Sequence, residues 1–288
     1  MNPKLSIICA SFNQAKFFKK TISALRGQSF KEFEIIIIDN YSTDDTEELT
    51  KLLDNVLFIK KKSSPSLAFE EAAKLARGKY LMWATTSDYL YSFDWIETAI
   101  NFLENNKNYS MVWTSSLNID EKGEGKSISG LIYFLKPPPS DKRYLGYWLN
   151  YHYIPELNYV IKRSVFIRCL TLNTDIDLVH RVLYAFTAFG YQQQYLIGVG
   201  HAGRTHDNQL TNINYTRDAK DNFRVIKLKY KLAMQILFCF EKKYILDSES
   251  NVVEYYNLMD KICLPLYYIY YKAFSIIARS IILILKKI

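Results

Sequence analysis

The sequence is poor in the features that mark several common classes of protein. Its four cysteines are far apart and form no C-x-x-C pair, so we expect reduced core thiols in a cytosolic protein. No G-x-G-x-x-G follows the first predicted strand, which argues against a dehydrogenase. The apolar run at residues 5–10 is too short for a signal peptide. The sequence contains no internal repeat, so a repeat protein is not expected.

Positive charge exceeds negative charge, because 37 lysines and arginines stand against 29 aspartates and glutamates, giving a formal net charge of +8. Such a balance suits nucleic acid, an anionic membrane surface or a phosphorylated substrate, and it does not choose among them. No RNA-recognition motif or zinc-ligand spacing is present, and acidic residues end the predicted strands. Nucleic acid is therefore not expected as a partner.

One stretch organises the N-terminal half: the strand predicted at residues 33–39 and the polar residues after it. Four consecutive isoleucines cannot alternate between core and solvent, so this strand is expected to be buried on both faces, as in the middle of a parallel sheet. Ligands of open α/β sheets bind just beyond the carboxyl ends of the strands. We therefore expect Asp39 at the rim of a ligand crevice, with Ser42 or Thr43 as the N-cap of a helix at residues 44–53.

Strands and helices alternate along residues 1–215, which predicts βαβ units and a mostly parallel sheet in one α/β domain. Residues 121–143, with several glycines, prolines and lysines, interrupt the pattern and are expected to form a mobile lobe or loop. Asn13 is a candidate helix cap, and Gly78 is a candidate C′ residue. The other expected elements are strands at 4–10, 55–59, 79–84, 110–115 and 192–197, a strand into a turn at 159–166, and helices at 14–25, 66–77, 93–103 and 175–189.

The C-terminal region, residues 216–288, differs in character and is expected to be a helical appendage. Lysine-rich helical patterns cover residues 218–240 and 252–271, and residues 264–288 are almost entirely apolar. Lys272 and Arg279 interrupt the run of about 20 apolar residues that a membrane span needs. On a helix these two residues and Lys286 form one basic stripe, which favours an amphipathic helix on a membrane surface. The alternative is a helix packed on the first domain, with the stripe in solvent.

Three motifs give the chain a family resemblance: A-S-F-N at residues 10–13, D-N-Y-S-T-D-D-T at 39–46 and A-R-G-K-Y at 76–80. They resemble motifs of family 2 glycosyltransferases, and the resemblance runs to about residue 211. It implies the GT-A fold, a Rossmann-like, mostly parallel mixed sheet flanked by helices. It also implies that Asp39 accepts a hydrogen bond from the base of a nucleotide-sugar. The residues assigned to the nucleotide-sugar are Ala10, Ser11, Asn13, Asp39, Ser42 and Arg204.

The D-x-D metal motif of that family is reduced here. Residues 85–88 read T-T-S-D, so only its last acid, Asp88, remains, and the sequence looks closer to the family branch with N-S-G-D. Asp88 can still serve Mg²⁺ or Mn²⁺ when a diphosphate supplies the other oxygens. The resemblance adds His206 as a metal ligand, and Arg204 could pair with the diphosphate as a planar donor fork. The alternatives are that Asp88 caps a turn and that His206 is an ordinary surface residue.

A second acidic segment, D-I-D-L-V-H-R at residues 175–181, resembles the start of the family's catalytic helix. On this match Asp175 is the base that takes the proton from the acceptor hydroxyl as it attacks the anomeric carbon. Asp177 lies two residues further on and faces elsewhere on a helix. The alternative is that Thr174 or Asp175 only caps the helix and favours its dipole.

The resemblance and the basic C-terminal region together predict an inverting glycosyltransferase that is cytoplasmic and peripheral on the inner face of the cytoplasmic membrane. Its donor is expected to be UDP-linked, and its acceptor a lipid-linked sugar or a surface glycan. The aromatic-rich residues 144–153 are candidates for stacking on acceptor sugars. The rival hypothesis is a catalytically silent homologue that binds a nucleotide-sugar or a partner subunit.

Overall fold

The computed structural model describes most of the predicted first domain and a few positions of the C-terminal region. The predicted base Asp175 and the aromatic-rich residues 144–153 lie outside the described residues. The described residues are 2–130, 133, 137–140, 159–171, 182, 186, 189–206, 244–246, 252–254, 269 and 273.

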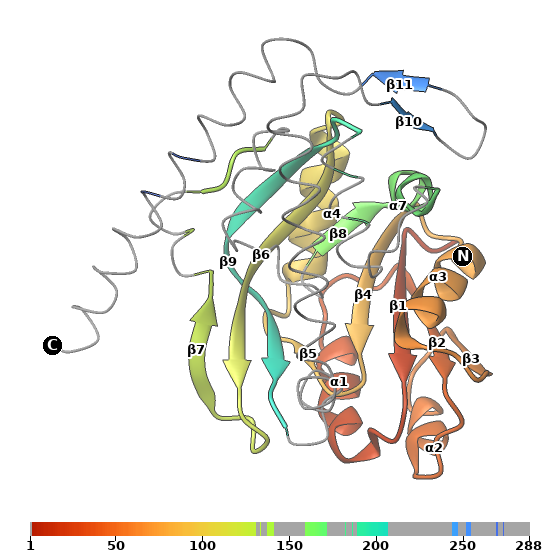
Figure 1. Ribbon diagram of the computed structural model, residues 1–288. Coiled ribbons are helices and arrows are strands. Elements are labelled where there is room, and N and C mark those ends of the chain that lie inside the picture. Colours follow the sequence, from red (N-terminus) through yellow and green to blue (C-terminus); the bar gives the residue numbers. More distant parts are fainter. Residues whose placement is uncertain are drawn as a thin grey trace, which may run out of the picture.

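Four parallel strands form the first half of the sheet (Figure 1). They lie in the order β3-β2-β1-β4, and Ser11 is opposite Asp39 where β1 and β2 end. This arrangement confirms the predicted βαβ units. The chain runs through β1 (Leu5–Ser11), α1 (Ala15–Arg26), β2 (Phe33–Asp39), α2 (Thr46–Thr50), β3 (Val56–Lys60), α3 (Pro65–Leu75) and β4 (Tyr80–Thr85).

The second half of the sheet mixes parallel and antiparallel pairs. The full order is β3-β2-β1-β4-β8-β6-β9-β5, and β7 pairs with β6. Strand β8 is antiparallel to both β4 and β6, whereas β9 is parallel to β6 and antiparallel to β5. The expected mixed sheet is therefore confirmed. Its elements are β5 (Tyr89–Leu90), α4 (Trp95–Asn105), β6 (Tyr109–Ile119), β7 (Gly125–Ser129), β8 (Tyr159–Lys162), α7 (Arg163–Leu170) and β9 (Gln192–Arg204).

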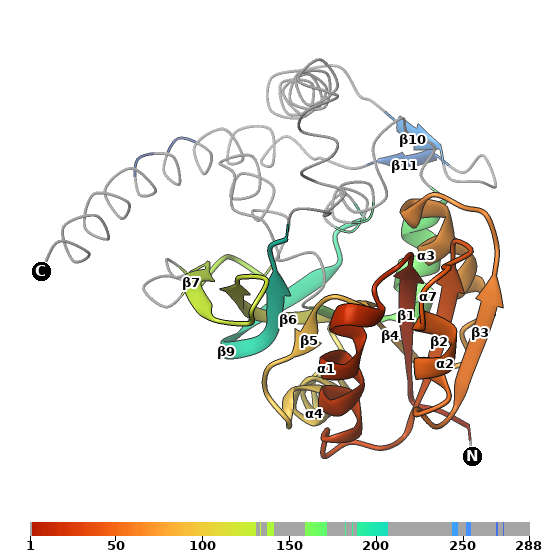
Figure 2. The same ribbon diagram turned by 90° about the horizontal axis from the view of Figure 1, so that it is seen from below.

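Two apolar clusters cover the two faces of this sheet, and the isoleucines of β2 divide between them. Residues 36 and 38 belong to the cluster with α3 and α7, whereas residues 35 and 37 belong to the cluster with α1 and α4. Helices thus lie on both faces of the sheet (Figure 2), and the expected burial of β2 on both faces is confirmed. Cys9 and Cys169 are free thiols buried in these clusters, as expected.

Several element predictions are wrong where pairing between distant segments decides the structure. The loop expected at residues 121–143 contains β7, which pairs with β6. The turn expected within residues 159–166 is the start of helix α7. The strand expected at residues 192–197 continues to Arg204, because its second half pairs with both β5 and β6.

The caps predicted for the first two helices are also wrong. Helix α2 begins after Asp45 rather than after Ser42 or Thr43, and helix α1 begins after Gln14 rather than after Asn13. Neither N-cap residue makes a side-chain capping hydrogen bond. The polar side chains of these loops bond across to one another instead.

The A-R-G-K-Y motif joins α3 to the start of β4 against β1 and β2. A Cβ on Gly78 would lie 2.6 Å from the backbone nitrogen of Ser6, so glycine permits close approach here and is not the left-handed helix end expected of it. The Arg77 guanidinium lies 2.7 Å from the buried Glu34 carboxylate. Although burial acts in the opposite direction, hydrogen bonds from Ser6 and Arg77 hold the pKa of Glu34 below its usual value.

The C-terminal region is described only at residues 269 and 273 and at a hairpin of β10 (Tyr244–Leu246) and β11 (Val252–Glu254). Strand β11 stands where the helix predicted at residues 252–271 was expected to begin, so that prediction is wrong at its start. Nearly all of the apolar segment 264–288 lies outside the described residues. Among the helices that the structure describes, none is long and apolar enough to cross a membrane.

Candidate active site

The loops that follow β1 and β2 are joined by hydrogen bonds at the carboxyl edge of the sheet. The Asn40 backbone N–H donates to the Ser11 carbonyl at 2.9 Å, and the Asn13 N–H donates to the Ser42 hydroxyl at 2.8 Å. In return, the Asn13 side-chain oxygen accepts from the Thr43 N–H at 2.8 Å. The two loops therefore form one unit, which brings together four of the predicted nucleotide-sugar residues.

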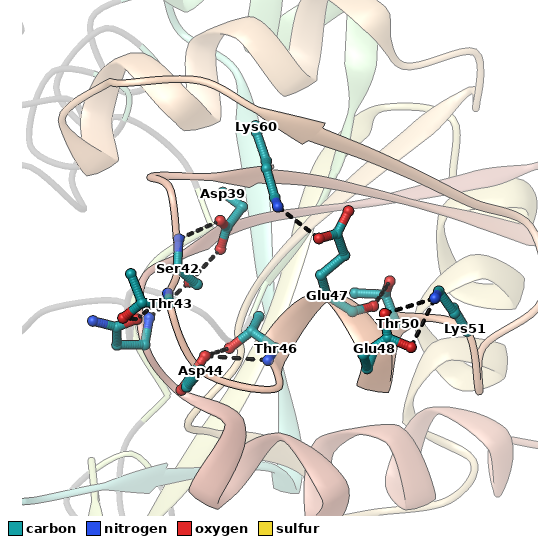
Figure 3. Close-up of polar contacts among 11 residues, drawn as sticks. Asp39, Ser42, Thr43, Asp44, Thr46, Glu47, Glu48, Thr50, Lys51 and Lys60 are labelled. Atoms are coloured by element: carbon teal, nitrogen blue, oxygen red, sulfur yellow. Dashed lines mark hydrogen bonds and ion pairs between the residues drawn. The ribbon is translucent and has the colours of Figure 1, made fainter.

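Asp39 is fully buried at the end of β2, and Ser42 holds its carboxylate (Figure 3). The Ser42 hydroxyl donates to Oδ1 at 2.6 Å, and the Ser42 N–H donates to Oδ2 at 2.7 Å. An ionised carboxylate has about four lone-pair sites, so each oxygen can still accept a further bond. Asp39 therefore keeps capacity to accept further hydrogen bonds, and a bond to it from a nucleobase N–H stays a prediction.

Ala10 and Ser11 lie at the end of β1, beside β4. Ala10 is opposite Thr85 in the sheet. Within the described structure, the buried hydroxyls of Ser11 and Thr86 have no hydrogen-bond partner. Buried hydroxyls of this kind are uncommon, and an additional group such as a water or ligand can satisfy them. Of these two residues, Ser11 is the one that lies opposite Asp39 in the sheet.

Asp44, the second acid of the D-N-Y-S-T-D-D-T motif, caps helix α1 from the neighbouring loop. Its Oδ2 accepts from the Ala15 N–H at 2.9 Å. Its Oδ1 accepts from the Thr46 hydroxyl and N–H at 2.5 and 3.1 Å, as Figure 3 shows. Although burial opposes the shift, these hydrogen bonds lower the pKa of Asp44. The capping role predicted for Asn13 is therefore supplied by Asp44.

Asp88 lies between β4 and β5, and both of its carboxylate oxygens accept hydrogen bonds. Oδ1 accepts from the Arg204 backbone N–H at 2.7 Å, and Oδ2 accepts from the Thr85 hydroxyl at 2.8 Å. The Thr21 hydroxyl of α1 donates to the Asp88 carbonyl. Asp88 therefore has a structural role, because its hydrogen bonds join α1, β4 and the end of β9.

The guanidinium of Arg204, the last residue of β9, donates to backbone carbonyls. Nε donates to the Ser87 carbonyl at 3.1 Å, and Nη1 donates to the carbonyls of Asp120 and Glu121 at 3.0 and 2.7 Å. The guanidinium carbon lies 4.8 Å from the ring centroid of Phe17. These bonds join the turn between β6 and β7 to the loop after β4. A contact between Arg204 and a diphosphate stays a prediction.

Two histidines lie near Asp88. The buried ring of His206 contacts the ring of Phe17, with centroids 4.9 Å apart. Burial lowers the pKa of His206, and the carboxylates of Asp88 and Glu121 act against that shift. His201, for which the sequence predicted no role, has Nε2 3.8 Å from Asp88 Oδ2, and neither of its ring nitrogens has a hydrogen-bond partner in the described structure. Pairing of β9 with β5 brings His201 there.

The described residues do not by themselves form a cation site. Over the ranges that the structure describes, no group of three His, Cys, Asp or Glu side chains could hold a metal ion. The predicted ligands Asp88 and His206 supply one carboxylate and one imidazole. A hard cation such as Mg²⁺ would therefore need further oxygens from a diphosphate to complete its coordination.

Asp175 lies outside the described residues, together with the rest of residues 172–181. Val182 and Phe186, four residues apart, are helical and buried. This agrees at those two positions with the helix predicted at residues 175–189. The role of Asp175 as catalytic base stays a prediction.

Comparison with known sequences places the chain among glycosyltransferases. Residues 6–170 match the profile of Glycosyl transferase family 2. An uncharacterized glycosyltransferase of Rickettsia felis is 36% identical over 125 residues, which are 42% of this chain but only 20% of that relative. The Escherichia coli protein WfaP, named a UDP-Glc:alpha-D-GlcNAc-diphosphoundecaprenol beta-1,3-glucosyltransferase, is 33% identical over 107 residues, covering 36% of this chain and 42% of WfaP.

Comparison with solved structures supports the fold. S. aureus TarS 1-349, solved in complex with UDP-GlcNAc, matches with a TM-score of 0.61 and 16% sequence identity, covering 81% of this chain and 66% of that chain. At this identity the likeness shows the fold alone, and it confirms the predicted GT-A architecture. The family match covers more than half of the 288 residues. The chain therefore belongs to glycosyl transferase family 2.

Proposed function

We propose that this glycosyltransferase moves a sugar from a nucleotide-sugar, with UDP as the nucleotide, to a hydroxyl of its acceptor. The observation that carries the proposal is the joined pair of loops in which Ser42 holds the buried Asp39 carboxylate, next to the Ser11 hydroxyl. A fixed carboxylate is a suitable acceptor for a nucleobase N–H. The UDP-sugars named for WfaP and for the TarS complex support UDP as the nucleotide.

Transfer is proposed to occur in one displacement with inversion. The acceptor oxygen attacks the anomeric carbon, the bond from that carbon to the diphosphate oxygen breaks, and the leaving diphosphate keeps the electron pair. Asp175 takes the proton of the acceptor hydroxyl as general base. Arg204 is proposed to bind the diphosphate. Mg²⁺ or Mn²⁺, bound through Asp88 and His206, would supply positive charge that stabilises the leaving diphosphate.

The acceptor is proposed to be a lipid-linked sugar or a surface glycan at the inner face of the cytoplasmic membrane. The substrate in WfaP's name is a sugar on diphosphoundecaprenol, which supports a lipid-linked acceptor. The basic stripe of Lys272, Arg279 and Lys286 in an apolar segment suits an anionic membrane surface. The C-terminal region would then hold the first domain close to its acceptor.

Thermal unfolding with a panel of nucleotide-sugars and Mn²⁺ tests the donor proposal. A ligand that binds only the folded chain stabilises it by mass action, by about 2.7 kcal/mol when its concentration is 100 times Kd. We expect a UDP-sugar to raise Tm, and GDP-sugars at the same concentration to raise it less. An unchanged Tm with every nucleotide-sugar would contradict the proposed function.

A second candidate is a catalytically silent homologue that binds the nucleotide-sugar. It is favoured by the reduced D-x-D motif, in which Asp88 is the one acidic residue that remains. Both carboxylate oxygens of Asp88 already accept hydrogen bonds within the protein. Calorimetry with UDP, with and without Mn²⁺, separates the candidates when it is combined with a turnover assay. Metal-dependent UDP binding with no transfer to any acceptor and no hydrolysis of the donor would support the silent homologue.

A further inference from the structure

Tyr41, between Asp39 and Ser42, occupies an unfavourable backbone conformation. Its φ is 58°, in the left-handed region that glycine adopts readily. The other non-glycine residues with positive φ in the described structure are Asn13 and Asn55. Asparagine tolerates this region because its short side chain bonds locally, whereas a bulky tyrosine is an outlier there.

Hydrogen bonds on both sides of Tyr41 impose this conformation. The N–H of the preceding residue, Asn40, donates to the Ser11 carbonyl at 2.9 Å. The following residue, Ser42, donates its N–H and its hydroxyl to the Asp39 carboxylate. The same bonds that fix Asp39 therefore fix the backbone of Tyr41, and glycine at this position would satisfy them without strain.

The side chain of Tyr41 does not compensate for this strain by packing in the core. Tyr41 is 57% exposed, whereas Asp39, two residues earlier, is 0% exposed. Tyr41 also belongs to neither of the two apolar clusters. A strained residue with no core contact is found mainly at sites where function requires it, because the surrounding structure must maintain it at a cost.

We propose that Tyr41 contacts the donor by packing its ring against the nucleobase that Asp39 binds. This inference rests on the proposed function, because it requires a nucleotide at the end of β2. Every nucleobase has a flat π face, and stacking on an aromatic side chain contributes roughly 5- to 140-fold in affinity. The loop thus presents one polar group, Asp39, for the edge of the base and one aromatic ring, Tyr41, for its face.

Calorimetric titration of the full chain with UDP tests this inference, with thermal unfolding measured on the same samples. Tyr41→Gly should weaken UDP binding about tenfold while Tm stays the same or rises, because glycine adopts the left-handed conformation without strain. Tyr41→Phe should keep the affinity within about twofold, because the ring remains. Tyr91→Ala is the matched control, since Tyr91 is 55% exposed just after β5, and its UDP affinity should equal that of the wild type.

Three outcomes would overturn the inference. Wild-type affinity in Tyr41→Gly would show that the ring makes no contact with the nucleotide. Weakened binding in Tyr41→Gly together with a clear fall in Tm would show that Tyr41 supports the loop and not the ligand. Weakened binding in Tyr41→Phe would exclude ring packing as the contact. No UDP binding by the wild-type chain is a different result, because it contradicts the proposed function itself and removes the inference with it.

Discussion

Ser42 shows how one small side chain orients a carboxylate before any ligand binds. Its hydroxyl donates to Asp39 and accepts from the Asn13 N–H, and its own N–H donates to Asp39 as well. Alanine at this position would leave Asn13 N–H and Asp39 Oδ1 without these partners. A group held in place in the free protein loses less conformational entropy when the ligand binds. We therefore expect the serine of the D-x-x-S motif to contribute to donor affinity through Asp39.

Asp175 is the proposed catalytic base, and its substitution tests the chemical step. Asparagine at this position keeps the shape of the side chain but cannot accept the proton, so Asp175→Asn should lower turnover by about 10²- to 10⁴-fold. The affinity for the UDP-sugar should stay within about twofold, since the base acts on the acceptor. Asp177→Asn is the control, because on the helix predicted at residues 175–189 a residue two positions after Asp175 would face elsewhere. Turnover and UDP-sugar affinity are measured for the wild type and both variants. Near wild-type turnover in Asp175→Asn would rule out Asp175 as the base.

Residues within a local motif could be predicted from the sequence, whereas residues placed by distant pairing could not. The D-x-x-S spacing indicated Asp39 and Ser42 directly. No role was predicted for His201, which reaches Asp88 because β9 pairs with β5. Tyr41 stands inside a motif, but its left-handed backbone depends on bonds between two loops that no local pattern reveals.

At the scale of elements, α1 depends on a cap that comes from another loop. The Ala15 N–H, the first of the helix, donates to Asp44, and Asp44 also accepts from Thr46 at the start of α2. One side chain therefore satisfies the N-terminal ends of two helices. A cap of this kind cannot be predicted from the residues next to the helix, because the capping side chain comes from a distant part of the sequence.

Replacing Asp44 by alanine should therefore destabilise the fold. We expect a loss of about 1–2 kcal/mol in the free energy of unfolding, the usual range for removal of a helix N-cap. Urea unfolding measures it as a fall in the midpoint with little change in slope. Asp54→Ala, in an exposed position before β3, is the control and should change stability by less than about 0.5 kcal/mol. Equal stability of the two variants would show that the cap contributes nothing.

Glu34 joins β2 to the segment between α3 and β4, and its charge makes stability depend on pH. Its pKa is lower in the folded chain, so its stabilisation is fully present above the pKa of an unfolded glutamate and is lost as pH falls through the folded value. Glu34→Gln should cost about 2 kcal/mol at pH 7, because charged hydrogen bonds to Ser6 and Arg77 are weakened. The difference from the wild type should shrink as the pH is lowered from 6 towards 3.

Urea unfolding across that pH range measures the effect. The control is Glu32→Gln, which removes an exposed pair with Lys4 and should cost less than about 1 kcal/mol at any pH. A difference between Glu34→Gln and the wild type that stays constant or grows as pH falls would contradict the predicted linkage.

Elements with a strong local pattern could be predicted from the sequence nearly to the residue. The bounds of β2 agree with the prediction, because its isoleucine run is both apolar and β-branched. Strand β7, with the sequence G-K-S-I-S, has no such pattern and exists through its pairing with β6. The second half of β9 was not predicted, because the glycines at residues 198, 200 and 203 are atypical of a strand. The pairing of β9 with β6 shows register shifts, which are typical of an irregular strand.

At the scale of the whole molecule, the basic and apolar C-terminal segment predicts attachment to anionic lipid. Replacing Lys272, Arg279 and Lys286 by glutamine in the full chain removes three charges, each worth about 1 kcal/mol near such a surface. Binding to phosphatidylglycerol vesicles at low salt should therefore weaken by about 100-fold in a sedimentation assay. The physical reason is loss of attraction to the lipid head groups, since the apolar residues of the segment are unchanged.

A second triple variant distinguishes the effect of this basic stripe from the effect of the overall net charge. Replacement of the exposed lysines 31, 51 and 74 by glutamine changes the net charge by the same amount on the first domain. It should leave vesicle binding within a few-fold of the wild type. An equal loss in the two triple variants would show that overall charge, and not the C-terminal stripe, attracts the lipid.

We expect a nucleotide to bind where β1 and β2 end, with Asp39 accepting from its base. Calorimetric titration with UDP and Mn²⁺ tests it most directly on the wild type and on Asp39→Asn, which keeps the shape of the side chain but replaces one acceptor oxygen by a donor. We expect saturable binding of one UDP per chain, weakened at least about tenfold in Asp39→Asn, with the variant still folded. Absence of UDP binding by the wild type, or equal affinity in the two proteins, would contradict it.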